Sequence, residues 1–226
     1  MLTAKINVGA LKAAALAASK ELSRHYLNGV LIEVRPRAVV YVATDGQMLF
    51  GYRDGLSERD PDNMLLGEFI VPVPVIKSIK LKKSVSEIAS LRDSANGDGE
   101  LTIKTADGGS YTFASIDGAF PNWRAVTPRA TSGEAAGGYN PKHVVALIAA
   151  GKLSGVGRPD ISYNGEQVAL MIYPRSAAFG VIIPLRGACG PSTAPEWIGP
   201  EAGQSVATAA KPTASPRPKI VAAKRA

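Results

Sequence analysis

Tyr26-Leu-Asn-Gly-Val-Leu-Ile-Glu33, followed eight residues later by Tyr41-Val-Ala-Thr-Asp-Gly-Gln-Met-Leu49, is the stretch that decides the fold of this 226-residue chain. It predicts two strands separated by a turn. The second strand closes on Thr44-Asp45-Gly46, and Asp and Gly are residue types that tight turns need. A related arrangement of strands recurs twice further along the chain, so we interpret the sequence as a weak repeat.

Each of the three repeated segments predicts a helix followed by about three strands. The first helix has an apolar stripe at i, i+4, i+7 and i+11. A short second helix carries Pro74 in its first turn, and the third has Asn140 as its N-cap and Pro141 at its first position. The predicted fold is therefore α+β, with helices packed on antiparallel sheets in about three half-units. The stripe is Leu11, Ala15, Ala18 and Leu22, and the strands are expected near 27–35, 38–44, 47–53, 69–72, 86–92, 100–105, 109–116, 160–164, 167–173 and 178–184.

Composition indicates a globular protein without a membrane span. Apolar residues make up 46% of the chain, yet no run approaches the roughly 18 consecutive apolar residues that a span needs. The N-terminus carries no signal-peptide core. The single cysteine, Cys189, cannot form an internal disulfide, which fits a reducing cytosol. We therefore expect a location in the bacterial cytoplasm or nucleoid.

The net charge of +7 points to a polyanionic partner, although solubility alone would tolerate it. In residues 191–226, five basic side chains against two acidic ones give +3 and leave +4 for the body. This segment is rich in Pro, Ala, Ser and Thr and predicts a disordered basic tail. Residues 129–138 have the composition of a linker.

Basic side chains lie opposite or beside the predicted apolar faces of all three helices. For one helix alone, a solvated surface is the ordinary explanation. Three such helices in repeated units favour a shared electropositive surface that binds duplex DNA through its phosphates, without sequence preference and with strong salt dependence. No aromatic-basic interleaving indicates stacking on single strands. The candidate DNA-binding residues are Lys12, Lys20, Arg24, Lys77, Lys80, Lys83, Lys142 and Lys152.

Catalysis has little support in the sequence. There are two histidines and one cysteine, and we find no metal-ligand spacing, no Gly-x-Ser-x-Gly elbow and no phosphate-binding loop. We therefore expect a protein that is not an enzyme and that needs no cofactor.

Two later segments extend the opening stretches into a family resemblance: Asp117-Gly-Ala-Phe-Pro-Asn-Trp-Arg-Ala-Val126 and Val181-Ile-Ile-Pro-Leu-Arg186. Together and in this order, over roughly residues 5–187, they resemble the β sliding clamp of bacterial DNA polymerase III. The resemblance implies a clamp-like domain at 1–128, similar to the clamp's middle domain. It also implies a half-unit at 139–190, similar to the end of the last domain. The chain is shorter than the family's three domains, as expected of a truncated clamp encoded by a phage or mobile element.

The resemblance implies a binding protein with a pocket for clamp-binding peptides of replication proteins. In the family, such peptides insert a Gln and two apolar anchors, and a Met-containing groove suits varied partners. The pocket would be lined by Thr44, Gly46, Gln47, Met48, Leu49, Pro121, Val126, Ile183, Pro184, Leu185 and Arg186. The chain departs from the family at Gln47-Met48, where His-Arg is usual, at Ala125 for a second Arg, and at His143 for an aromatic.

Two functions follow from this resemblance. One is a sliding-clamp-like processivity factor, a homo-oligomer that encircles or lies on duplex DNA. The other is an interaction protein without a ring that competes for the clamp-binding peptides of the host replication machinery. Three half-units in one chain do not make the usual dimeric ring of six domains, so the sequence leaves the oligomeric state open.

Overall fold

The structure is a computed structural model that describes residues 2–55, 64–80, 87–93, 99–134, 138–155, 159–172 and 177–185. The chain divides into two compact units, Met1–Cys189 and Gly190–Ala226, and all described residues belong to the first. Several predicted features lie outside the described residues: the tail at 191–226, Lys83 and Arg186. In the part that is described, no helix is long and apolar enough to cross a membrane.

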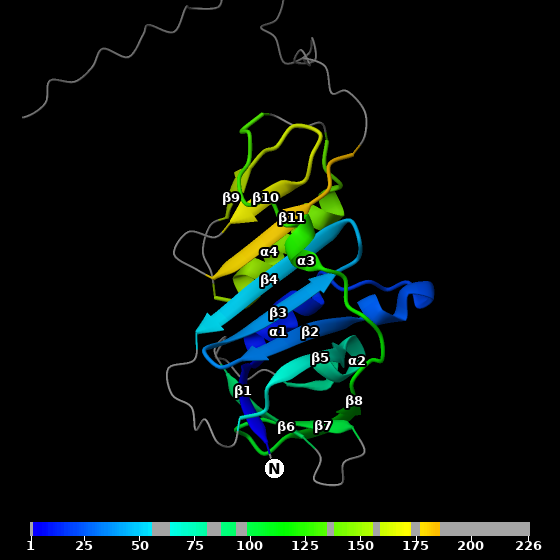
Figure 1. The fold of residues 1–226 in the computed structure, drawn as a ribbon, viewed down its shortest axis with the longest axis vertical. Coiled ribbons are helices and arrows are strands. Elements are labelled where there is room, and N and C mark those ends of the chain that lie inside the picture. The colour runs from blue at the N-terminus through cyan, green and yellow to red at the C-terminus, as the bar shows by residue number, and fades with distance from the viewer. Residues whose placement is uncertain are drawn as a thin grey trace, which may run out of the picture. The chain divides into compact units, whose positions relative to one another are not determined.

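Two antiparallel sheets form the frame (Figure 1). The larger has the strand order β5-β2-β3-β4-β11-β10-β9, and the smaller has the order β1-β6-β7-β8. Four helices and one 3-10 helix complete the described fold. The strands are β1 (Thr3–Asn7), β2 (Gly29–Arg35), β3 (Ala38–Thr44), β4 (Met48–Gly55), β5 (Gly67–Pro72), β6 (Ile88–Asp93), β7 (Glu100–Lys104), β8 (Ser110–Ala114), β9 (Asp160–Ser162), β10 (Ala169–Ile172) and β11 (Ala178–Ile182), and the helices are α1 (Val8–Ala15), η1 (Leu22–Leu27), α2 (Val73–Ser78), α3 (Trp123–Val126) and α4 (Pro141–Leu153).

The first and third predicted half-units share one sheet, because β4 pairs with β11. The register places Leu49 opposite Val181 and Gly51 opposite Phe179. Beyond the strands, the Ile183 backbone N–H donates to the Gln47 carbonyl at 2.9 Å. Segments that are about 130 residues apart therefore lie side by side at the bend predicted from the sequence.

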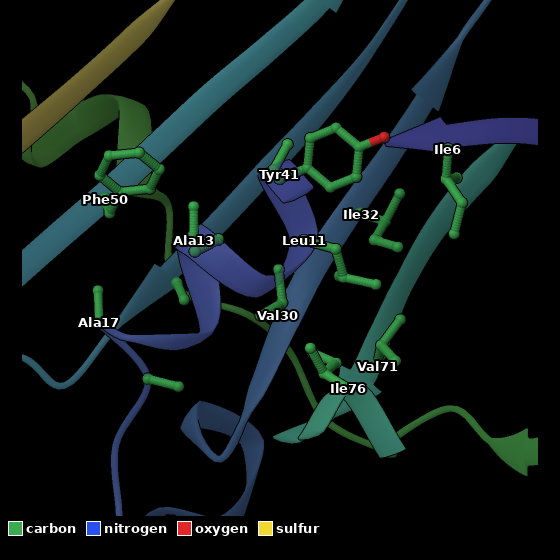
Figure 2. Packing of buried hydrophobic residues seen from close by; sticks show 14 of the residues in the cluster. Ile6, Leu11, Ala13, Ala17, Val30, Ile32, Tyr41, Phe50, Val71 and Ile76 are labelled. Carbon is green, nitrogen blue, oxygen red and sulfur yellow. The ribbon is translucent and has the colours of Figure 1, made fainter. Parts of the chain in front are cut away.

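One face of the large sheet, the helix face, is covered by α1, α2 and α4, which lie behind it in Figure 1. Figure 2 shows Leu11 and Ala13 of α1 packed among side chains of the sheet, including Ile32 and Tyr41. The Asn7 side chain caps α1 by accepting from the Ala10 backbone N–H at 3.0 Å. Burial of its apolar side chains, such as Leu11 and Ala13, is what stabilises so short a helix.

The opposite face, the connector face, is covered by the connector, which we define as residues 115–128 and which includes α3. Ile116, Phe120 and Trp123 pack on Leu31 and Val181, with other buried residues of the sheet. Successive side chains of a strand point to opposite faces, so β2 is buried on both sides from Gly29 to Val34. This explains why its apolar residues do not alternate with polar ones; Glu33 is the one charged residue in the buried stretch.

The first predicted helix is wrong at its C-terminal end. The helix stops at Ala15, and Leu22, which was expected in its apolar stripe, is 92% exposed. The reason is that the Ser19 backbone N–H donates to the Leu27 carbonyl at 3.0 Å, which turns the chain toward β2. Strand β1 was missed, although Ala4 and Ile6 are buried and alternate with the exposed Lys5, the period of a strand.

Candidate peptide-binding pocket

An apolar pocket lies on the connector face, where the bend after β3, the connector and the end of β11 meet. Its volume is about 180 Å³. Eight of the residues that the sequence predicted for a peptide pocket line it together: Thr44, Gly46, Gln47, Met48, Leu49, Pro121, Val126 and Ile183. Four further lining residues were not predicted: Leu27, Trp123, Val168 and Val181.

The bend is held by its own side chains. The Asp45 carboxylate accepts from the backbone N–H groups of Gln47 and Met48, both at 2.8 Å. The Thr44 hydroxyl donates to the Met48 carbonyl at 2.6 Å and accepts from the Gly46 N–H at 3.0 Å. Gly46 has φ +91°, a value that favours glycine. The predicted turn is thus a pre-formed wall of the pocket.

The connector is fixed by a buried carboxylate, Glu33, whose side chain is 2% exposed. Arg124 donates to both of its oxygens, at 2.8 and 2.6 Å, and Trp123 Nε1 donates to it at 2.9 Å. Burial pushes the pKa of Glu33 up, but the hydrogen bonds from Arg124 and Trp123 and the charges of Arg124 and Arg35 outweigh it, so the pKa is lowered. A single acidic residue of β2 therefore positions the Trp123 wall of the pocket.

Two further predicted pocket residues, Pro184 and Leu185, do not line it. Pro184 is buried, which follows from strand-like alternation after Ile183. Leu185 is 55% exposed, and its backbone N–H donates to the Gly138 carbonyl at 2.8 Å. Arg186 lies outside the described residues.

A second hollow, of about 420 Å³, lies beside the bend on the side of α4. His143 is 8% exposed, and its Nε2 is 3.5 Å from Asp45 Oδ2. Three of the predicted DNA-binding residues line this hollow: Lys20, Arg24 and Lys142. Arg24 also contacts Glu21 at 3.6 Å. Lys20 and Arg24 are thus brought to the edge of the bend, since the first helix ends before them.

The other described candidates for DNA binding belong to the helices or their ends. Lys77, Lys80 and Lys152 are exposed at the C-terminal ends of α2 and α4. Lys12 is partly buried in α1, and this burial lowers its pKa. Within the described ranges, no group of three His, Cys, Asp or Glu side chains is placed to hold a metal ion.

Gly51 lets Phe179 support the pocket. A Cβ at Gly51 would lie 2.3 Å from the Phe179 ring, and that ring packs on Trp123 with centroids 5.7 Å apart. We expect Gly51→Ala to lower the free energy of unfolding by about 1–3 kcal/mol, the usual cost of overpacking, as measured by urea denaturation. Gly55→Ala, in the same strand with nothing within 4 Å, is the control. Equal stability of the two variants would contradict this role.

No family model and no curated protein matches the sequence. The fold, however, matches solved structures of bacterial DNA polymerase III β subunits, the sliding clamps. The Bacillus subtilis clamp matches with a TM-score of 0.65 at 14% identity, over 82% of this chain and 64% of that one. The Thermotoga maritima β subunit matches with a TM-score of 0.63 at 13% identity, over 83% of this chain and 66% of that one. A Pseudomonas aeruginosa clamp bound to griselimycin matches with a TM-score of 0.62 at 18% identity, over 82% of this chain and 65% of that one.

These matches confirm the predicted fold class: the chain has the α+β fold of the β sliding clamp. At identities of 13–18% the likeness is one of fold. The chain spans about two thirds of the length of these clamps, 64–66%.

Proposed function

We propose that this chain, which has the fold of the bacterial β sliding clamp, acts as a sliding-clamp-like processivity factor that docks apolar peptides of replication proteins and lies on duplex DNA. The observation that carries the proposal is the pocket. Eight residues chosen from the sequence, which come from three separate segments, line one apolar hollow. Convergence of distant segments on one concave site is typical of a binding site.

The pocket's chemistry fits a short apolar anchor. Leu49 is almost buried at its floor, while Val126 and Ile183 are 55% and 46% exposed at its rim. A partner side chain would cover these exposed groups and gain about 25 cal/mol for each Å² of apolar surface removed from water.

We expect Val126→Asp to weaken binding of a labelled Gln-Leu-x-Leu-Phe peptide by about 10- to 100-fold, since a carboxylate in the groove loses its hydration when the peptide covers it. Fluorescence anisotropy measures the affinity. Val145→Asp is the matched control, because Val145 is 65% exposed on α4 and does not line the pocket. A peptide that binds both variants as tightly as the unchanged protein would place its site elsewhere.

The DNA half of the proposal rests on the exposed lysines at the ends of α2 and α4. Each Lys that contacts a phosphate contributes about 0.9 to the slope of log affinity against log salt concentration. We expect Lys77→Glu/Lys80→Glu/Lys152→Glu to reduce the magnitude of that slope by about 2–3 for a short duplex. The same variant should weaken binding at low salt. An unchanged slope would overturn the DNA half. Peptide binding with no DNA binding at all would instead favour the interaction protein without a ring.

A further inference from the structure

A second groove on the connector face lies next to the peptide pocket. Its volume is about 850 Å³, and it lies between the β2–β3 turn, β4, α3 and β11. Trp123 lines both this groove and the pocket, so the two hollows meet at one side chain. A chain that leaves the pocket past Trp123 would enter this groove. We call it the arginine groove and define it by Arg35, Arg37, Arg53, Arg124, Trp123 and Phe179.

Among the residues that the structure describes, the lining of the arginine groove carries positive charge and no carboxylate. Two of its four arginines are already paired: Arg124 with the buried Glu33, and Arg35 with Glu68. For Arg37 and Arg53, both exposed, the described part of the chain contains no ion pair. Their guanidinium groups therefore remain to receive anions, and a planar guanidinium matches a carboxylate with two parallel hydrogen bonds.

The groove's floor is aromatic. Trp123 and Phe179 are partly buried and pack at 5.7 Å, and Arg124 stacks 4.1 Å from the Trp123 ring centre. An apolar floor with cationic walls suits a peptide that carries acidic side chains, because its backbone and apolar atoms cover the rings while its carboxylates reach the guanidinium groups. The protein's own basic segment 191–226, with its net charge of +3, has the wrong sign for this groove.

We propose that the arginine groove binds acidic residues that flank the apolar anchors of a partner peptide docked in the neighbouring pocket. The inference rests on the proposed function and adds the partner's chemistry: apolar anchors followed or preceded by Asp and Glu. The groove then provides selectivity among peptides that fill the pocket equally well.

The test is an anisotropy titration of the full chain with two kinds of labelled peptide. Both carry the same anchors, but one has an Asp-Glu pair and the other an Asn-Gln pair, placed in turn before and after the anchors. We expect at least about fivefold tighter binding of one acidic peptide at low salt, a preference that disappears near 1 M salt. Arg37→Gln/Arg53→Gln should remove the preference and leave affinity for the Asn-Gln peptides unchanged.

Lys77→Gln/Lys152→Gln is the matched control, since it removes the same net charge from the helices and should keep the preference. A preference that persists in the arginine variant would contradict the proposed role of the groove. Equal binding of the acidic and neutral peptides would also contradict it. Neither outcome would contradict peptide binding in the pocket. If no peptide binds, the pocket and the groove fail together. Loss of duplex binding in the arginine variant would assign the groove to nucleic acid and overturn the proposal as well.

Discussion

Replacing Arg124 with alanine is expected to lower the free energy of unfolding at pH 7 by about 2–3 kcal/mol. The substitution strands the Glu33 carboxylate, which is 2% exposed and whose other partners among the described residues are the Trp123 N–H at 2.9 Å and Arg35 at 3.6 Å. Breaking a buried ion pair costs about 3–5 kcal/mol. We expect less here because Arg124 itself is 54% exposed, so its half of the pair is screened by water.

The pH dependence provides a sharper signature than the loss itself. In the unchanged protein the pKa of Glu33 is lowered, so its contribution to stability is present above its ordinary value of 4.5 and is lost as pH falls through the folded-state pKa. Without Arg124, burial is the main influence left and raises the pKa of this carboxyl. The difference in the free energy of unfolding between Arg124→Ala and the unchanged protein therefore becomes smaller as pH falls from 7 toward 4.

Urea denaturation across this pH range measures the effect. The double variant Glu33→Gln/Arg124→Ala is the control, because the neutral amide leaves no buried charge to strand; it should be more stable at pH 7 than Arg124→Ala alone. A deficit of Arg124→Ala that is the same at pH 7 and pH 4 would contradict the assignment of Glu33 as the charged anchor of the connector.

Replacing Tyr41 with alanine is expected to cost about 3–5 kcal/mol, the range for truncating a buried aromatic ring. Tyr41 is fully buried in β3, and Figure 2 shows its ring packed over α1 with its hydroxyl directed at the junction of β1 and α1. That hydroxyl accepts from the Asn7 backbone N–H at 2.6 Å. The residue thus ties together the large sheet, α1 and the strand β1 that the sequence did not predict.

Tyr41→Phe separates the two contributions. It keeps the ring but leaves the buried Asn7 N–H without this acceptor, which costs about 1–3 kcal/mol. Thermal or urea unfolding of both variants gives the comparison. If Tyr41→Phe were as damaging as Tyr41→Ala, the hydrogen bond and not the ring would hold the core together, contrary to the packing described here.

Several single helices, caps and turns were predicted well from the sequence because their signals are local. The helix cap at Asn140, with Pro141 following, starts α4 where it was expected. Strands β7 and β8 lie within the ranges expected for them, and the chain turns between them at Asp107-Gly108, with Gly108 at φ +89°. Asp45 and Gly46 build the bend through contacts within four residues of the chain. Such contacts can be predicted from the spacing of turn and cap residues.

Features that depend on distant pairing could not be predicted in this way. Val168 and Val181 enter the pocket only because β11 pairs with β4, a register with no local signature. Glu33 was expected only as a strand residue; its role depends on Trp123 and Arg124, about ninety positions later. Ending the first helix at Ala15 likewise needs the Ser19–Leu27 contact. The family resemblance predicted eight of the residues that line the pocket, whereas the other four could be found only from the pairing of distant strands and the packing of the connector.

The most direct test of the central claim uses valine methyl groups as reporters inside the folded protein. Val126 is 55% exposed and lines the pocket, whereas Val71 is fully buried in the core on the helix face. With ¹³C-methyl valine and a Gln-Leu-x-Leu-Phe peptide, we expect saturable movement of the Val126 resonances while those of Val71 stay in place. Peptide binding that leaves Val126 unmoved, or no binding at high protein concentration, would contradict the proposed pocket.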